Sequence, residues 1–502
     1  MSGNQNATLE KGVMPPAQHQ ALEWIRSGKK HLLIDGQWVA AASGKTFETI
    51  NPATEEMLTQ VAEADAHDVD AAVSAARRAF EAPSWSGISP HERGRYLTRI
   101  ADAIEAHAEE LAAIESLDIG APLSFTRGQV AATAERFRYY AGWTSKIYGT
   151  TNASDASRFI YMVREPMGVC ALINAWNFPL VMAASKLAPA LACGNTMVLK
   201  PAEQSPLTTL RLAELVQEAG VPDGVVNVVQ GYGAIVGAAM AAHPGVDKIA
   251  FTGSTAVGRS IVQASAGNMK KATLELGGKS PNIIFADADL ALAIKASAQA
   301  FCRNSGQICS AGTRLLVHES VYEEVTAGIV AAAAGFKVGS PFASDTDLGP
   351  LISARQMDRV LSYIDTGKKE GAELVLGGSR LGKTGFFVEP TVFANVTNDM
   401  TIAREEIFGP VLSIIRFKDE ADAIAQANDT TYGLAAAVWT RDVSRAHRMM
   451  RAIKSGRVWI NTYAEGDPVM AIGGYKQSGY GREMGAESID AYTQTKSVLM
   501  RL

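Results

Sequence analysis

Hydrophobic and polar positions divide the chain into stretches of different periodicity. Two short apolar runs flank Asp35 and Gly36, and this spacing predicts a β-hairpin over residues 32–39. From residue 65 to 115 apolar positions recur every three or four residues, which predicts alanine-rich amphipathic helices. From residue 162 onward, short β-rich runs alternate with helical stretches. This alternation is typical of parallel sheets flanked by helices.

The alternation of strands and helices occurs twice and predicts an α/β fold with two domains. Expected strands lie at 168–173, 196–200, 225–229 and 248–251 in the first set, and at 281–285, 314–317 and 412–415 in the second. A last alternating run, residues 493–502, is predicted to be a strand without a visible partner, which invites pairing with another subunit. Residues 1–30 begin polar and then show a short helical pattern, so we expect a loosely attached arm.

Length and composition are those of an ordinary multidomain globular protein. The 502 residues exceed the size of a single growing core, and 47% are hydrophobic, 20% are charged and the net charge is -5. This balance calls for neither nucleic acid nor a membrane, and no apolar run approaches the ~18 residues of a membrane span. Four cysteines without a C-x-x-C pair and a polar N-terminus without a signal sequence predict a cytoplasmic protein. The eight histidines are scattered singly, so no metal site is expected.

Cys309 lies in a sequence context that suits a reactive cysteine. It lies in a short polar, glycine-containing loop between apolar segments, where a side chain can be held and still meet a small molecule. A buried structural cysteine is the plain alternative. Three other motifs accompany this loop: Glu275 to Lys279 upstream, Asn177 between Trp176 and Phe178, and Glu405 to Pro410 downstream.

Together these motifs resemble the aldehyde dehydrogenase superfamily, in its NAD(P)-dependent hydrolytic branch, from about residue 30 to the C-terminus. The resemblance implies two Rossmann-like parallel-sheet domains and a small β oligomerisation element. The implied divisions are an N-terminal arm (1–30), an NAD-binding domain (31–149 and 168–277), a catalytic domain (278–477) and the oligomerisation element (150–167 and 478–502). The implied partners are a small-molecule aldehyde and further copies of the chain, as a dimer or tetramer.

The resemblance also assigns the catalytic groups. Cys309 is the expected nucleophile, because a thiolate adds to the aldehyde and the adduct then releases hydride to a nicotinamide, leaving a thioester. Asn177 and the backbone N–H of Cys309 are the expected oxyanion donors. Glu275 is the expected general base, with a raised pKa and glycines beside it that permit close backbone approach. Cys302 is expected only to pack. Without the resemblance, Asn177 is a plausible turn residue and Glu275 a surface acid.

Two glycine-rich stretches compete for the phosphates of the cofactor. Gly231–Gly237 looks like a dinucleotide fingerprint, but its third glycine comes one residue late. Phe251–Gly258 follows an expected strand, opens a helix and matches the family motif. We therefore expect Gly253 and Ser254 to bind the cofactor.

The resemblance places further cofactor contacts at two ends of the dinucleotide. Lys200 and Glu203 are expected at the adenosine ribose, where a carboxylate accepts hydrogen bonds from both hydroxyls and repels a 2′-phosphate. This favours NAD over NADP. Glu406, with Phe408 beside it, is expected at the nicotinamide ribose, and Trp176 in the same site. As plain alternatives, Glu203 is a helix-start acid and Glu406 a solvated acid before a turn.

The substrate tunnel is also implied by the resemblance. Its expected lining is Phe178, Met182, Ser185, Arg303, Ile308, Ser310 and the loop 464–472, in which Gly466 and Ile472 are singled out. Ser185, Gly466 and Ile472 are small or aliphatic where relatives often carry aromatic residues, so a medium or bulky aldehyde (aromatic, terpenoid or long aliphatic) is favoured. Arg303 can hold an acidic tail, whereas Glu465 and Asp467 can attract a cationic one. A semialdehyde or an amino-aldehyde is therefore the alternative.

Three rival functions stay open. An acylating relative would pass the thioester to coenzyme A, and such members generally lack a glutamate at the position of Glu275. A non-catalytic binding or structural homologue would be expected to have lost its catalytic residues, and none is lost here. A pure esterase would hydrolyse esters and form no NADH from any aldehyde.

Overall fold

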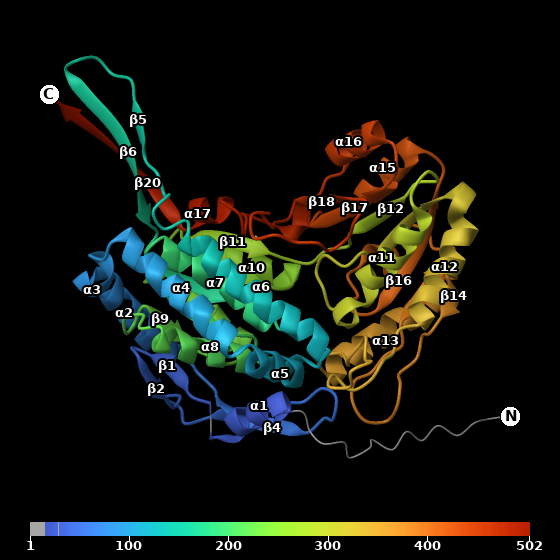
Figure 1. Ribbon diagram of the computed structural model, residues 1–502, viewed down its shortest axis with the longest axis horizontal. Coiled ribbons are helices and arrows are strands. Elements are labelled where there is room, and N and C mark those ends of the chain that lie inside the picture. The colour runs from blue at the N-terminus through green and yellow to red at the C-terminus, as the bar shows by residue number, and fades with distance from the viewer. Residues whose placement is uncertain (1–15, 29) are drawn as a thin grey trace.

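Two large sheets organise the computed structural model, which describes residues 16–28 and 30–502 (Figure 1). In order across the first sheet, the strands are β19 (Gly479–Tyr480), β11 (Lys271–Glu275), β10 (Lys248–Thr252), β7 (Val169–Ile173), β8 (Thr196–Lys200), β9 (Val226–Val228), β1 (Leu32–Ile34) and β2 (Gln37–Val39). In the second they are β14 (Glu373–Leu376), β15 (Thr391–Ala394), β16 (Val411–Phe417), β13 (Arg314–His318), β12 (Pro281–Ile284), β17 (Ala435–Trp439) and β18 (Arg457–Ile460).

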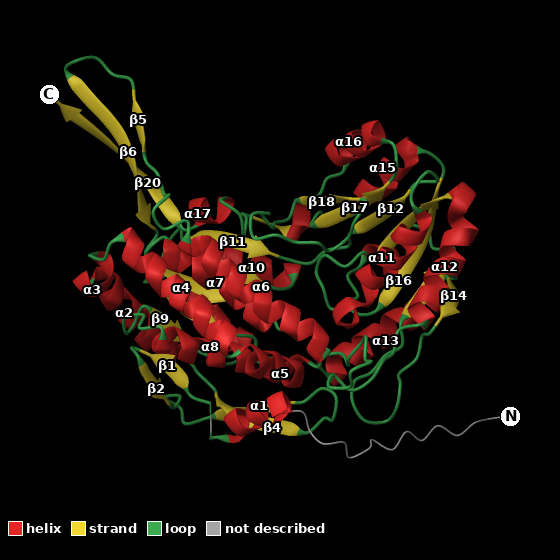
Figure 2. Cartoon of the chain, in the orientation of Figure 1, coloured by secondary structure: helices red, strands yellow, loops and turns green. Residues whose placement is uncertain are grey.

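Helices pack against both sheets (Figure 2). With the first sheet lie α1 (Pro16–Arg26), α2 (Ala66–Glu81), α3 (Pro83–Ser86), α4 (Pro90–Ala106), α5 (Ala108–Ile119), α6 (Leu123–Ala141), α7 (Pro179–Ala192), α8 (Leu207–Glu218), α9 (Ala238–Ala242), α10 (Thr255–Ser265) and α17 (Glu487–Ala491). With the second lie α11 (Leu290–Cys302), α12 (Tyr322–Ala334), α13 (Ala354–Lys369), α14 (Thr401–Arg404), α15 (Glu420–Asn428) and α16 (Val443–Ala452). The predicted α/β class with two parallel-sheet units is confirmed.

The middle of the first sheet is parallel, from β11 through β10, β7 and β8 to β9. Every residue of β7, β8 and β10 is buried, because helices cover the strands on both sides, and the sequence of each is accordingly a nearly continuous apolar run. The chain extends from β7 towards β8 on one side and returns to β10 on the other. The carboxyl ends of β7 and β10 therefore form a topological switch point, the usual ligand site of such sheets.

The N-terminal segment is not loosely attached where the structure describes it. Helix α1 buries Ala21 and Ile25 completely and packs against α5. The indole of Trp24 donates a hydrogen bond to Glu214, Nε1 to Oε2 2.9 Å. The expected arm is thus wrong for residues 16–28 and 30, while residues 1–15 and 29 lie outside the described residues.

The C-terminal strand has a partner within its own chain. β20 (Thr493–Arg501) pairs antiparallel with β6 (Arg158–Pro166), from Thr493 opposite Pro166 to Arg501 opposite Arg158. With β5 (Thr150–Asn152) they form a small sheet that projects from the molecule (Figure 1). The expectation that the C-terminal strand has no partner in its own chain is therefore wrong. Because β19 pairs with β11, the C-terminal part of the expected oligomerisation element begins only at Thr493. A separate hairpin joins β3 (Thr46–Ile50) and β4 (Met57–Ala62). In the described part of the chain, no helix has both the length and the apolar character that a membrane span requires.

Candidate active site

The loop that carries Cys309 leaves α11 through a tight turn. Asn304 and Ser305 have φ angles of 49° and 53°, in the left-handed region that non-glycine residues rarely adopt, and Gly306 follows at 72°. The side chain of Gln307 holds the turn closed. Its Nε2 donates to the carbonyl of Asn304 at 3.1 Å, and its Oε1 accepts from the backbone N–H of Ile352 at 2.9 Å. The cysteine loop is thus fixed before any ligand binds.

Asn177 follows β7 and is bonded directly to the cysteine loop. Its side-chain Nδ2 donates to the carbonyl of Gln307 at 2.8 Å, and Asn304 Nδ2 donates back to the carbonyl of Asn177 at 3.0 Å. The side chain of Asn177 is buried. Because an amide NH₂ has two donors, one N–H of Asn177 is left for an oxyanion beside Cys309.

Gly277 and Gly278, which follow β11, bring three functional residues together. A Cβ on Gly277 would lie 2.3 Å from Oε2 of Glu406, and one on Gly278 would lie 2.3 Å from the carbonyl oxygen of Cys309. The backbone N–H of Gly278 also donates to Glu406 Oε1 at 2.9 Å. Side chains at these two positions would force the cysteine loop and Glu406 away from the end of β11, where Glu275 stands. The close backbone approach expected from the sequence is present.

Burial raises the pKa of each acidic group at this junction. Burial raises the pKa of the Cys309 thiol to about 12, and the carboxylates of Glu406 and Glu275 add to the effect. Burial also raises the pKa of Glu275 well above its ordinary value, with further help from Glu483, and that of Glu406 to about 7. A thiolate nucleophile and a carboxylate base are ionised forms, so in the expected roles Cys309 and Glu275 both depend on deprotonation.

Two charged residues beside Glu275 escaped the sequence analysis. Lys186, on α7, is fully buried and donates to Oγ1 of Thr252 at 2.6 Å, and its Nζ lies 2.9 Å from Oε1 of Glu483. The Lys186 cation lowers the pKa of Glu275, whereas Glu483 raises it. A signal existed, because Lys186 is the only charged residue in an otherwise apolar helix. Its partner lies 297 residues away, which no local pattern indicates.

The expected adenosine end of the cofactor site contains a preformed ion pair. Lys200, the last residue of β8, is buried, and its Nζ donates to the carbonyl of Pro201 at 2.9 Å and lies 3.4 Å from Oε2 of Glu203. Burial lowers the pKa of Lys200. Glu203 stays partly exposed, so its carboxylate can still accept from a ribose.

The expected phosphate site lies at the start of α10. Ser254 is the N-cap and accepts from the backbone N–H of Val257 at 3.3 Å, so the other free N–H groups of the first turn stay available to an anion. A Cβ on Gly253 would lie 2.4 Å from the Phe251 ring. The competing stretch forms instead a π-helical turn, Gly233–Gly237, that leads into the short helix α9.

Two aromatic rings are in contact at the expected nicotinamide end of the cofactor site. The rings of Trp176 and Phe408 meet edge to face, with centroids 5.1 Å apart. Phe408 has a φ of 62°, so its backbone is held in the left-handed region beside Glu406.

A cavity of ≈ 360 Å³ lies against both neighbours of Cys309. Of the eight side chains expected in the tunnel, Arg303, Ile308 and Ser310 line it. Ala464, from the expected loop, also lines it, as do Gln299 and Tyr463, which the sequence analysis had not assigned to the tunnel. The five others do not line this cavity: Phe178, which packs against Phe125, Met182 and Ser185 on α7, and Gly466 and Ile472 in the loop after β18. Cys302 also borders it but is almost completely buried, which agrees with a packing role.

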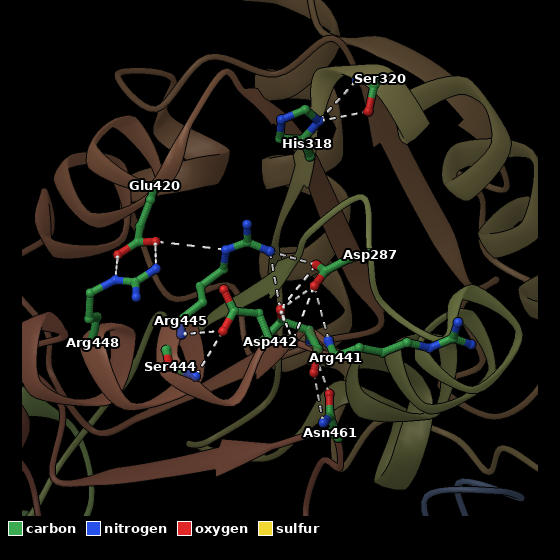
Figure 3. Close-up of polar contacts among 11 residues, drawn as sticks. Asp287, His318, Ser320, Glu420, Arg441, Asp442, Ser444, Arg445, Arg448 and Asn461 are labelled. Carbon is green, nitrogen blue, oxygen red and sulfur yellow. Dashed lines mark hydrogen bonds and ion pairs between the residues drawn. The ribbon is translucent and has the colours of Figure 1, made fainter.

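The loop after β18 is anchored by a polar network (Figure 3). Asn461 begins the loop, and its side chain bonds both backbone groups of Thr440, accepting from the N–H at 3.0 Å and donating to the carbonyl at 2.9 Å. Asp287 in turn accepts from the Thr440 hydroxyl at 2.8 Å, from the backbone N–H groups of Arg441 and Asp442 at 3.2 Å each, and from Arg445 at 2.7 Å. This network fixes one wall of the site to the second sheet.

Comparison with known proteins gives one consistent family. The model of the Aldehyde dehydrogenase family matches residues 38–498. An aldehyde dehydrogenase from Aspergillus niger is 50% identical over 472 residues, which cover 94% of this chain and 95% of that protein. Human retinal dehydrogenase 2 is 49% identical over 475 residues, or 94% and 92% of the two chains. The NAD+ complex structure of an aldehyde dehydrogenase from Bacillus cereus superposes with a TM-score of 0.95 at 48% identity, covering 98% and 99%.

Proposed function

Because the chain belongs to the aldehyde dehydrogenase family and is an NAD-dependent aldehyde dehydrogenase, we propose a covalent mechanism for it. The aldehyde is oxidised through a thiohemiacetal and then a thioester on Cys309. One observation carries the proposal. Two hydrogen bonds join Asn177 to the loop of Cys309. Gly278, just after Glu275 and β11, lies against the carbonyl of Cys309. Nucleophile, oxyanion donor and base are thereby brought to one place.

The residues at the switch point fit NAD. The N-terminus of α10 suits a pyrophosphate, the Lys200–Glu203 pair suits ribose hydroxyls, and Glu406, with Phe408 and Trp176, would hold the nicotinamide ribose. A carboxylate at Glu203 disfavours a 2′-phosphate, which supports NAD over NADP. When bound, NAD supplies the acceptor for the hydride.

The reaction then follows from the side chains. The Cys309 thiol loses its proton to water, and Sγ adds to the aldehyde carbon, while the oxyanion accepts hydrogen bonds from Asn177 Nδ2 and the Cys309 N–H. Loss of hydride from this adduct leaves a thioester. Glu275, as a carboxylate, takes a proton from water, and the resulting hydroxide attacks the thioester carbon. The C–S bond breaks, the acid leaves and the Cys309 thiolate is restored.

One comparison supports a medium or bulky substrate. The human relative is named for retinal, itself a bulky aldehyde. An aromatic, terpenoid or long aliphatic aldehyde is thus the proposed substrate, with a semialdehyde or amino-aldehyde as the alternative.

The proposed assembly is a homo-oligomer, a dimer or a tetramer. β20 lies at the edge of the projecting sheet, so its outer backbone groups are available to another subunit. The proposed location is the cytoplasm, since all four cysteines are free thiols, as a reducing compartment would keep them.

The deciding experiment measures NADH formation by wild type and Cys309→Ala over short aliphatic, long or terpenoid, aromatic, amino and semialdehyde substrates. Turnover by wild type that vanishes in the variant supports the proposal and identifies the substrate class. Turnover retained by the variant removes Cys309 from the mechanism. Silence of wild type on all aldehydes favours a binding protein, or an esterase if esters are hydrolysed. Product that requires coenzyme A identifies the acylating reaction.

A further inference from the structure

The cysteine loop is held from both sides of Cys309 by side chains that come from different sheets. Before Cys309, the amide of Asn177 donates to the carbonyl of Gln307 at 2.8 Å. After it, the hydroxyl of Tyr463 donates to the carbonyl of Ser310, with 2.7 Å between Oη and O. Asn177 follows β7 of the first sheet, and Tyr463 follows β18 of the second. The nucleophile therefore lies between two hydrogen bonds, of which only the first belongs to the expected catalytic groups.

The side chain of Tyr463 is closely confined. It is buried, and its ring packs against that of Trp459, with centroids 4.9 Å apart. A Cβ on Gly312 would lie 2.9 Å from Cζ of Tyr463 and 3.0 Å from Oη, so the glycine lets the end of the ring reach the loop. Burial raises the pKa of the phenol, and Tyr463 therefore stays a hydrogen-bond donor near neutral pH.

The turn that carries Tyr463 is fixed by the network of Figure 3. Asn461 and Ala464 have φ angles of 53° and 60°, in the left-handed region that non-glycine residues rarely adopt. Such a conformation persists only where its surroundings hold it. Here the side chain of Asn461 bonds both backbone groups of Thr440, which Asp287 holds in turn. The position of the phenol is thus set from the second sheet.

Two peptide groups link the phenol to the backbone N–H of Cys309. The carbonyl that accepts from Tyr463 belongs to the Ser310–Ala311 peptide, whose N–H donates to the carbonyl of Ile308 at 3.0 Å. The Ile308 carbonyl shares a planar peptide group with the N–H of Cys309, so the two turn together. Two rigid planes joined by one hydrogen bond therefore connect Tyr463 to the expected oxyanion donor.

We propose that Tyr463 is a positioning residue, whose hydroxyl acts through these two peptide groups to aim the N–H of Cys309 at the oxyanion. The inference rests on the proposed function, in which Cys309 is the nucleophile. An oxyanion donor contributes most when it is in place before the negative charge develops. A phenylalanine at position 463 would keep the packing on Trp459 but would lose this control of the loop.

The test compares Tyr463→Phe with Tyr322→Phe. Tyr322 is the control, because it is a buried tyrosine whose hydroxyl donates to the carbonyl of Ile414 at 3.3 Å and accepts from the N–H of Asn395 at 2.8 Å. Both changes remove one buried hydroxyl and keep the ring. Tyr463→Phe is expected to lower the single-turnover rate of NADH formation about 3- to 10-fold, the range for one neutral hydrogen bond. Tyr322→Phe is expected to keep the wild-type rate.

A second comparison separates positioning from contact with the substrate, because Tyr463 also lines the cavity beside Cys309. The loss in Tyr463→Phe should be equal for a short and a long aldehyde that wild type oxidises. It should appear in the single-turnover rate and leave both KM for the aldehyde and the dissociation constant of NAD unchanged. A loss confined to KM, or one that grows with the length of the aldehyde, makes Tyr463 a wall of the cavity and overturns the inference.

The inference and the proposed function fail in different ways. An unchanged single-turnover rate in Tyr463→Phe, or an equal loss in Tyr322→Phe, overturns the inference and leaves the proposed function standing. Turnover retained by Cys309→Ala, or absence of NADH from every aldehyde with wild type, overturns the proposed function and the inference with it.

Discussion

Glu275 is an acid whose position fixes the pH dependence of the enzyme. Burial, and then Glu483, raises its pKa, so the carboxylate form required of the proposed base becomes more populated as pH rises. The raised pKa of the Cys309 thiol, about 12, likewise predicts a rate that increases with pH. We predict that kcat/KM rises with pH from about 6 to about 9. A profile that falls over this range contradicts the assignment.

Replacing Glu275 separates the two halves of the reaction. Glu275→Gln keeps the shape of the side chain but cannot accept a proton, so the thioester should form and then persist. We predict a first burst of NADH of one equivalent per site, followed by a steady rate lower by about 10²–10⁴-fold. Stopped-flow absorbance measures both phases. A normal steady rate would show that another group activates the water.

Substitutions of Lys186 and of Glu483 are expected to shift the pKa of Glu275 in opposite directions. Lys186→Met removes the cation that favours the carboxylate and leaves Glu483 beside it, so the acidic limb of the pH profile should move to higher pH. Glu483→Gln removes the like charge, and the limb should move to lower pH. The measurement is the pH dependence of kcat for both. Movement in the same direction would refute the electrostatic account.

The anchoring network of Figure 3 shows how one element depends on a single carboxylate. Asp287→Ala removes the acceptor of the Thr440 hydroxyl and of the Arg441 N–H. It also removes one of two acceptors of the Asp442 N–H and of Arg445, which both donate to the Thr440 hydroxyl as well. We predict a loss of about 1–3 kcal/mol in the free energy of unfolding, measured by denaturant titration. Arg448→Ala is the control, since among the described residues Arg448 pairs with Glu420 alone and its side chain is exposed, and the change should cost at most about 1 kcal/mol. Equal losses would mean that the network adds nothing to a surface ion pair.

Elements differ in how well the sequence predicts them. The strands β7, β8 and β10 were predicted to within one residue, because strands buried on both faces are continuous apolar runs. The attachment of α1 was not predicted, because its fully buried side chains are only Ala21 and Ile25 and the surface that covers them, α5, is distant in sequence. The pairing of β20 with β6 is equally non-local. Periodicity reveals which residues seek burial, and only the assembled chain shows against what.

At the scale of the whole molecule, some residues of the site could be predicted from the sequence and others could not. Cys309 and Asn177 stand in short motifs in loops and Glu275 in a short motif at the end of β11, so the sequence alone brings them to attention. The setting of Lys186 depends on Glu483, which lies 297 residues away and which no local pattern indicates. Charges in a site are therefore weighed by their partners, which a list of residues does not contain.

The projecting sheet of β5, β6 and β20 is where we expect subunits to associate. Leu499 is 59% exposed, Met500 48% and Phe159, opposite Met500, 42%, so the sheet presents apolar side chains to solvent. Another subunit that adds to the edge of β20 would cover such groups, and Leu499→Asp should lower the molar mass measured by light scattering. Ser497→Asp is the control, because Ser497 lies on the same face of the strand and the change adds the same charge without removing apolar surface. If both variants keep the mass of wild type, the subunits meet elsewhere.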